Sequence, residues 1–159
     1  MADDPLIQTD QKKELISKHQ FYFDTPLYEA IQLVNLEPKV LDGNVDGYNS
    51  ISHFDTTFEI DSSRIGNSYS DYYEFLTVTL TCKRNGKDKL RFFVYLTEEE
   101  LVKLGQYPSL ADIQFASLGK KYDKVLDKES LFEFKRAIGL AAHGTGIGSF
   151  VYLRRIFEN

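Results

Sequence analysis

The residues whose types and spacing are suited to chemistry lie near the C-terminus, between His143 and Ser149. Gly144, Gly146 and Gly148 alternate there with other residues and separate two segments whose apolar side chains have helical spacing. Glycine loses more backbone entropy on folding than any other residue, so such a cluster indicates a tight turn, a positive φ or a backbone held close to another group. The segment predicts either an anion-binding loop or a ligand-free reversal between two helices.

The anion-binding interpretation places Ser149 at the N-cap of the last helix, where free backbone amides face a phosphate or a nucleotide. His143, Arg154 and Arg155 would add positive charge to the same site. The segment is not a Walker A loop, because no lysine follows its glycines, and no strand precedes it as in a dinucleotide fingerprint. In the ligand-free interpretation, Gly144 ends one helix, Ser149 begins the next, and the arginines are solvated.

A second candidate is a group of tyrosines in a polar segment, followed much later by aromatic residues in the last helix. Tyrosine is enriched at protein interfaces, because its rigid ring supplies contact area and its hydroxyl a hydrogen bond. The alternative is that these rings cover the core of the domain. The first interpretation predicts a protein-binding surface that includes Tyr69, Tyr72, Tyr73, Phe150 and Phe157.

Metal and nucleophile chemistry has weaker signals. His19, His53 and His143 are too far apart in sequence for a local metal motif. Residues 42–47 match the start of an EF-hand loop, but His53 occupies the position of its bidentate glutamate, so we expect a plain turn. Cys82 lies in a strand-like run, where a small buried hydrophobe is expected rather than a nucleophile. We therefore expect no metal, no cofactor and no catalytic residue.

Composition limits the class of protein. A chain of 159 residues with 42% hydrophobic residues is expected to fold as one domain over 1–159. A net charge of −5 argues against binding to nucleic acid or to an anionic membrane. A single cysteine and the lack of a signal peptide or a long apolar segment favour a cytoplasmic protein. The final helix ends without a polar tail, as expected for a domain taken from a longer protein.

The elements that must position these residues can be read from periodicity. One helix is predicted over 10–19. A second is predicted after the Thr25-Pro26 start, with apolar residues at helical spacing as far as Val34, and Pro38 ends it. Residues 53–60 alternate as a strand with one wet face. A hairpin is predicted around Asn85-Gly86, in the register that places Leu80 opposite Leu90, because only that register puts the apolar residues of both strands on one face.

The C-terminal half is predicted to be helical. Thr97 and Glu100 have the spacing of a capping box, which predicts a helix that ends at Gly105. Ser109 is predicted to begin the next helix, which ends at Gly119. Further helices are predicted over 128–141, after an Asp N-cap, and over 150–159.

Together these patterns predict an α+β domain: an antiparallel β-meander of three or more strands, N-terminal helices, and a helical C-terminal half packed on the sheet. The function that the sequence favours is a non-enzymatic protein-interaction domain that binds a protein partner or a second copy of itself. The alternative is a phosphate- or nucleotide-binding domain, with or without enzymatic activity, that uses the loop from Gly144 to Ser149.

Overall fold

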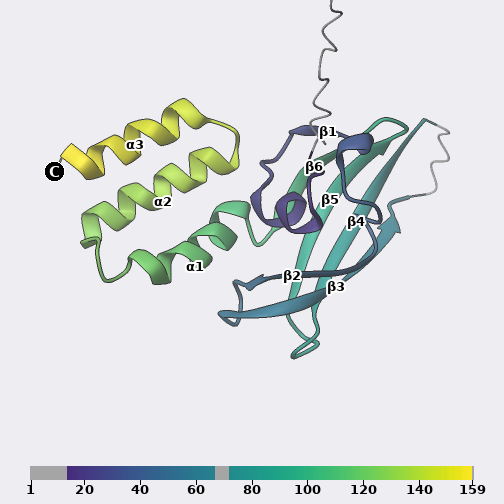
Figure 1. Ribbon diagram of the computed structural model, residues 1–159, viewed down its shortest axis with the longest axis horizontal. Helices are drawn as coiled ribbons and strands as arrows, with labels where there is room; N and C mark the ends of the chain where they lie inside the picture. The colour runs from purple at the N-terminus through teal and green to yellow at the C-terminus, as the bar shows by residue number, and fades with distance from the viewer. Residues whose placement is uncertain (1–13, 67–71, 159) are drawn as a thin grey trace, which may run out of the picture.

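The computed structural model describes residues 14–66 and 72–158 (Figure 1). Their strands form a six-stranded antiparallel sheet in the order β1-β6-β5-β4-β3-β2, and helices follow it, so the predicted α+β class with an antiparallel meander is confirmed. The strands are β1 (Ala30–Gln32), β2 (Gly43–Asn49), β3 (Phe54–Arg64), β4 (Tyr73–Cys82), β5 (Lys89–Thr97) and β6 (Glu100–Tyr107).

The β4–β5 hairpin has the predicted register. Leu80 lies opposite Leu90, and Gly86 adopts a positive φ of 66° in the connecting loop. The apolar side chains of both strands consequently share one buried face, which includes Val78 and Phe92. This agreement follows from the period of two in a strand, because a shift by one residue would expose every one of these side chains.

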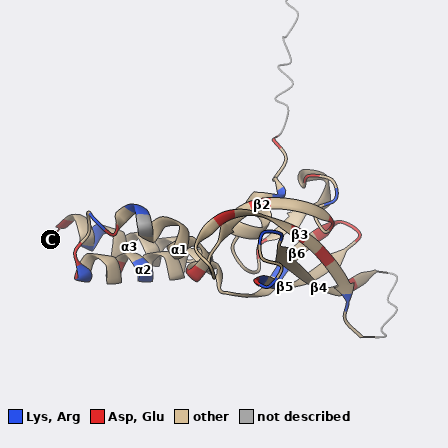
Figure 2. Cartoon of the chain, turned by 90° about the horizontal axis from the view of Figure 1, so that it is seen from below, with Lys and Arg blue, Asp and Glu red and all other residues tan. Residues whose placement is uncertain are grey.

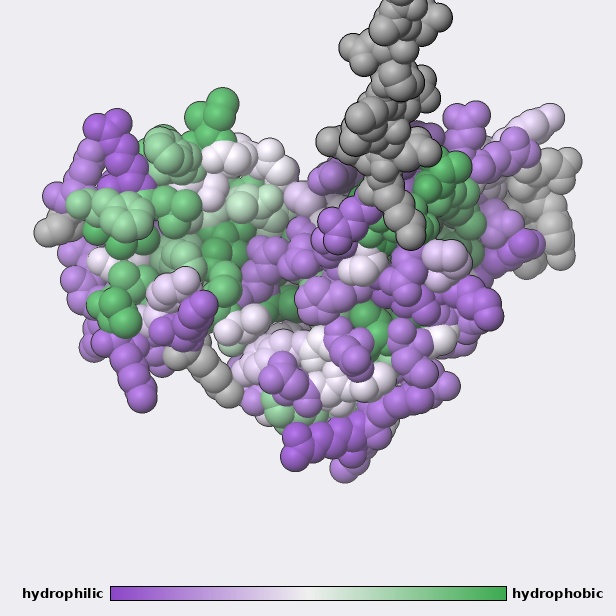
Figure 3. Space-filling model, in the orientation of Figure 1, coloured by the Kyte–Doolittle hydropathy of each residue, from purple (hydrophilic) through white to green (hydrophobic). Residues whose placement is uncertain are grey.

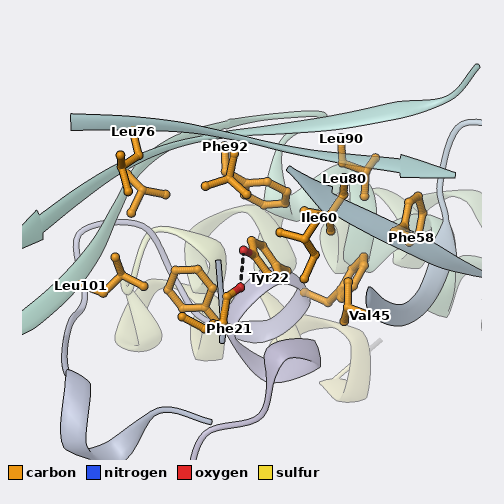
Figure 4. Packing of buried hydrophobic residues seen from close by; sticks show 14 of the residues in the cluster. Phe21, Tyr22, Val45, Phe58, Ile60, Leu76, Leu80, Leu90, Phe92 and Leu101 are labelled. Carbon is orange, nitrogen blue, oxygen red and sulfur yellow. Dashed lines mark hydrogen bonds between the residues drawn. The ribbon is translucent and has the colours of Figure 1, made fainter. Parts of the chain in front are cut away.

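The sheet curls around a short segment that precedes it in the chain. This segment, η1 (Gln20–Asp24), is a π-helix whose last backbone N–H, from Thr25, donates to the Gln20 carbonyl at 2.8 Å. Phe21 and Tyr22 in η1 have no exposed surface and point into the apolar face of the sheet (Figure 4). The Tyr22 and Phe92 rings pack edge to face with their centroids 5.0 Å apart. Burial raises the pKa of the Tyr22 hydroxyl. The inner face of the sheet is thus filled by η1.

The predicted N-terminal helices are not confirmed. Of the helix over 10–19, residues 10–13 lie outside the described part, and Ile16 forms a β-bridge with Leu36. The helix predicted as far as Val34 is replaced by β1 and the short 3₁₀ helix η2 (Leu33–Asn35). Ile31 at the centre of β1 is buried opposite Leu101 of β6, so pairing with an available sheet edge outweighs the weak local helical spacing.

Two further local predictions are wrong for the same reason. The helix predicted from Thr97 to Gly105 is instead the turn into β6, and Gly105 lies inside that strand. The Thr97 hydroxyl does accept from the Glu100 backbone N–H at 3.0 Å, as in a capping box, but here this hydrogen bond spans the short connection between β5 and β6. The turn predicted over 42–47 is mostly strand β2, paired along its length with β3. Local polar patterns do not distinguish these outcomes, because they are compatible with turns, caps and strands alike.

A buried asparagine ties the ends of two hairpins together. Asn49, at the end of β2, has no exposed surface, and its amide nitrogen donates to the Asp88 carboxylate at 2.8 Å. Ser52 and Asn85 also donate to that carboxylate. These hydrogen bonds hold the pKa of Asp88 below its usual value and join the β2–β3 turn to the β4–β5 loop.

The C-terminal helices occur largely where they are predicted, at α1 (Leu110–Tyr122), α2 (Lys128–Ala142) and α3 (Gly146–Glu158). Ser109 and Asp127 are the N-caps of α1 and α2, as predicted, although α1 continues beyond Gly119. The predicted packing of these helices over a face of the sheet is not confirmed. α1 lies against η1 and β2, while α2 and α3 pack on each other and extend away from the sheet (Figures 1 and 2).

Candidate functional site

The glycine segment forms the tight reversal between α2 and α3. Gly144 has a φ of 74°, and its N–H donates to the Ala141 carbonyl at 2.9 Å, as at the end of a helix. α3 begins at Gly146 rather than near Phe150, and Ser149 is buried in its first turns, so Ser149 is not the N-cap. A Cβ at Gly148 would lie 3.1 Å from a methyl carbon of Leu140, so this glycine lets α3 approach α2 closely.

The predicted basic partners of the loop have other contacts. Arg154 donates to Glu158 one turn later on α3. Arg155 lies 3.6 Å from the carboxylate of Glu133 on α2, and its guanidinium lies over the Tyr152 ring. His143 is exposed at the end of α2. The anion-binding role of this loop stays a prediction, while the contacts described here account for its residues by helix termination and helix packing.

The predicted tyrosine surface is part of a larger aromatic cluster on the outer face of the sheet. Tyr69 lies outside the described residues, and Tyr72 is exposed just before β4. Tyr73 contacts Phe75 and Tyr95, with ring centroids 6.0 and 5.9 Å apart. The Phe75 ring in turn stacks on Phe93 of β5 at 5.8 Å. Phe75 and Phe93 are 37% and 39% exposed, so the cluster is partly covered and partly open to solvent.

Within the described part of the chain, α3 carries several strongly exposed apolar side chains. Its inner face packs on α2, but its outer face carries large apolar side chains that are strongly exposed, and Figure 3 shows apolar residues gathered over the helices. We define the α3 stripe as Ile147, Phe150, Val151 and Phe157, which are 87%, 67%, 47% and 88% exposed. Of these, Phe150 and Phe157 were predicted from the sequence. Ile147 and Val151 were missed because the helix was predicted to begin too late and the pattern alone did not show which face packs.

Lys103 is a buried lysine whose pKa is strongly lowered. It lies on the inner side of β6 with no exposed surface, and its Nζ donates to the Tyr22 carbonyl at 3.4 Å and to the Gln106 side-chain oxygen at 3.3 Å. Burial lowers the pKa of Lys103 to about 7, and the carboxylates of Asp24 and Glu29 partly oppose this shift. A neutral lysine is a nucleophile only where a substrate reaches it, so this buried amine is better explained as a tie between β6 and η1.

Cys82 is buried, as expected for a small hydrophobe in a strand, with Thr56 Oγ1 at 3.6 Å from its sulfur. Among the described residues, no group of three or more His, Cys, Asp or Glu side chains is placed to hold a metal ion. No described helix has the length and hydropathy needed to span a membrane. The chain matches no family model, no curated protein and no solved structure.

Proposed function

We propose that this chain is a protein-interaction domain and that it associates with a second copy of itself through the α3 stripe. The observation that carries the proposal is that α3 is apolar on two faces, of which only one packs on α2. Contiguous exposed apolar surface of this kind is uncommon on monomeric domains and typically marks an interface.

The spacing of the stripe indicates the shape of the partner. Phe150 and Val151 follow Ile147 by three and four residues, and Phe157 follows Phe150 by seven, so the four side chains lie along one side of the helix, with Arg154 between Phe150 and Phe157 on the same side. A second helix buries such a stripe most completely, because its side chains fit between those of the first. The partner surface is therefore helical and apolar, as α3 itself is.

Charge makes a second copy a suitable partner. The whole chain carries a net charge of −5, so two copies repel each other over most of their surfaces. The side chains of the stripe are uncharged, and the neighbouring Arg154 and Glu158 are of opposite sign and paired with each other. Figure 2 shows both signs of charge on α2 and α3. A twofold contact brings the same patch together from both copies, so a patch without net charge is suited to it.

Sedimentation velocity over a range of concentrations tests the proposal. We expect the wild-type chain to show a reversible monomer–dimer equilibrium. Phe150→Glu should raise the dissociation constant about tenfold or more, because it replaces an aromatic side chain that the dimer buries with a charged one. Val34→Glu is the matched control, since Val34 is 82% exposed in the sheet part of the chain and lies outside the stripe. A wild-type chain that stays monomeric, or a Phe150→Glu variant that associates as the wild type does, would overturn the proposal.

A further inference from the structure

η1, β2 and α1 come together at a distance from α3 (Figure 1). Residues of these three elements line a groove. It consists of two hollows, of about 270 Å³ and about 560 Å³, which share His19, Tyr48 and Ser117 in their lining. Volumes of this size suit a small ligand or a single side chain. The residues of the groove come from segments that are distant in sequence, so no local motif could have predicted it.

His19 is held in one orientation although half of its side chain is exposed. Its Nδ1 lies 2.8 Å from the Asp46 carbonyl oxygen, and its ring stacks on Phe23 at 4.9 Å between centroids. Because a carbonyl oxygen can only accept, Nδ1 carries the proton, and Nε2 of the neutral ring is an acceptor. Gly47 makes this arrangement possible, since a Cβ there would lie 2.4 Å from the Phe23 ring.

The spacing between His19 and Asp24 leaves room for a third group. Nε2 lies 4.0 Å from a carboxylate oxygen of Asp24, which is longer than a hydrogen bond between them. A nitrogen about 2.8 Å from both acceptors would make an angle of roughly 90° with them, which an ammonium or guanidinium group can accept. The two acceptors are therefore placed to share one donor nitrogen.

The remaining lining indicates the charge and polarity of the ligand. Asp46 and Asp55 line the larger hollow, and neither hollow has a lysine or arginine among its described lining residues. Ile113 and Leu118 of α1, with Phe23, supply apolar surface in the smaller hollow. The carboxylates disfavour an anion. A cation that carries an apolar segment fits the groove, because its charge lies near the carboxylates and its apolar segment contacts the apolar lining.

We propose that the groove binds a small organic cation, a protonated amine or a guanidinium on an apolar segment, with its nitrogen between His19 Nε2 and the Asp24 carboxylate. The same chemistry is available from a free amine and from a lysine or arginine side chain of a peptide. This site is independent of the α3 stripe, so either proposal can fail without the other.

Titration of the ¹⁵N-labelled chain, followed by amide chemical shifts, tests this site. The probes are phenethylamine and agmatine as free cations, end-blocked peptides with one lysine or one arginine as the second source, and 2-phenylethanol as the uncharged match for phenethylamine. We expect a cation from at least one source to shift the amides of His19, Tyr48 and Ser117, and we expect the alcohol to leave them unchanged. Binding of the alcohol as strongly as the amine, or no shift with any cation, would overturn the proposal.

Variants identify the residues responsible. His19→Phe keeps a ring to stack on Phe23 but removes the acceptor, so we expect it to weaken binding about tenfold or more. His143→Phe is the matched control at the exposed end of α2 and should bind as the wild type does. Asp24 is not substituted, because its charge also acts on Lys103. Instead, Ser117→Tyr places a large side chain in the groove from the exposed surface of α1, and it should abolish binding. Unchanged binding by both His19→Phe and Ser117→Tyr would place the ligand elsewhere.

Discussion

At the scale of single residues, Lys103 shows how burial changes an ionisable group. Its pKa is lowered to about 7 because the folded chain removes the ammonium from water, and nearby carboxylates restore only part of the lost stabilisation. Between that value and the pKa of an exposed lysine, about 10.4, the unfolded chain binds a proton that the folded chain does not. The contribution of Lys103 to the free energy of unfolding therefore rises with pH across this range. Below about pH 7 the lysine is charged in both states, and burying that charge destabilises the folded chain by the full amount.

Lys103→Met should remove this dependence. We expect the variant to be more stable than the wild type at pH 7 by about 1 to 3 kcal/mol, because an apolar side chain replaces a buried charge of similar length. The difference should narrow as the pH rises toward 10, where the wild-type lysine is neutral in the folded state. Urea unfolding at several pH values from 6 to 10 measures it. If the free energies of unfolding of the two proteins, plotted against pH, stay parallel across this range, the pKa of Lys103 is not lowered in this way.

The groove shows which residues cannot be found from sequence alone. From the sequence, His19 was considered only as a member of a three-histidine metal site, because the sequence does not show that its ring contacts Phe23 and Asp46. The π-helix that positions His19 and Asp24 has no reliable sequence signal, and π-helical turns are frequent at functional sites. The pairing of these residues becomes visible only when η1, β2 and α1 are brought together.

At the scale of elements, the reversal between α2 and α3 distinguishes a structural glycine from a replaceable one. Gly144 has a positive φ, so Gly144→Ala should destabilise the chain by about 1 kcal/mol. Gly146 begins α3 with open space around it, so Gly146→Ala should be neutral or stabilise by about 0.5 to 1 kcal/mol. Thermal unfolding of both variants measures the difference. An equal loss of stability in the two variants would contradict the role assigned to Gly144.

Prediction of elements succeeded where tertiary pairing and local pattern agree. The β4–β5 register was predicted because Leu80 and Leu90 must share the buried face, and the caps at Ser109 and Asp127 were predicted because their side chains bond the nearby backbone. β6 was predicted as a helix because the hydrogen bond from Glu100 to Thr97 is the same in a capping box and in a turn. The segment forms a strand because it pairs with β5, and a local stretch of sequence does not show that pairing.

At the scale of the whole molecule, the chain consists of a curled sheet closed by η1 and a pair of helices that extends beyond it (Figure 1). The core under the sheet buries its apolar residues well, whereas α3 leaves a stripe of them exposed. This contrast between the two parts is the basis for the central claim that α3 packs on a second copy. The acidic net charge of the chain limits such contact to surfaces that, like the stripe, carry no excess charge.

Cross-linking at a single introduced cysteine tests that claim most directly. Arg154→Cys places a thiol beside the stripe, Lys89→Cys places one on the exposed outer side of β5, and the native Cys82 is buried and should not react. With a short bismaleimide at concentrations where the chain associates, we expect covalent dimers from Arg154→Cys and monomers from Lys89→Cys. Dimers in equal yield from both variants, or none from Arg154→Cys, would contradict an interface formed by α3.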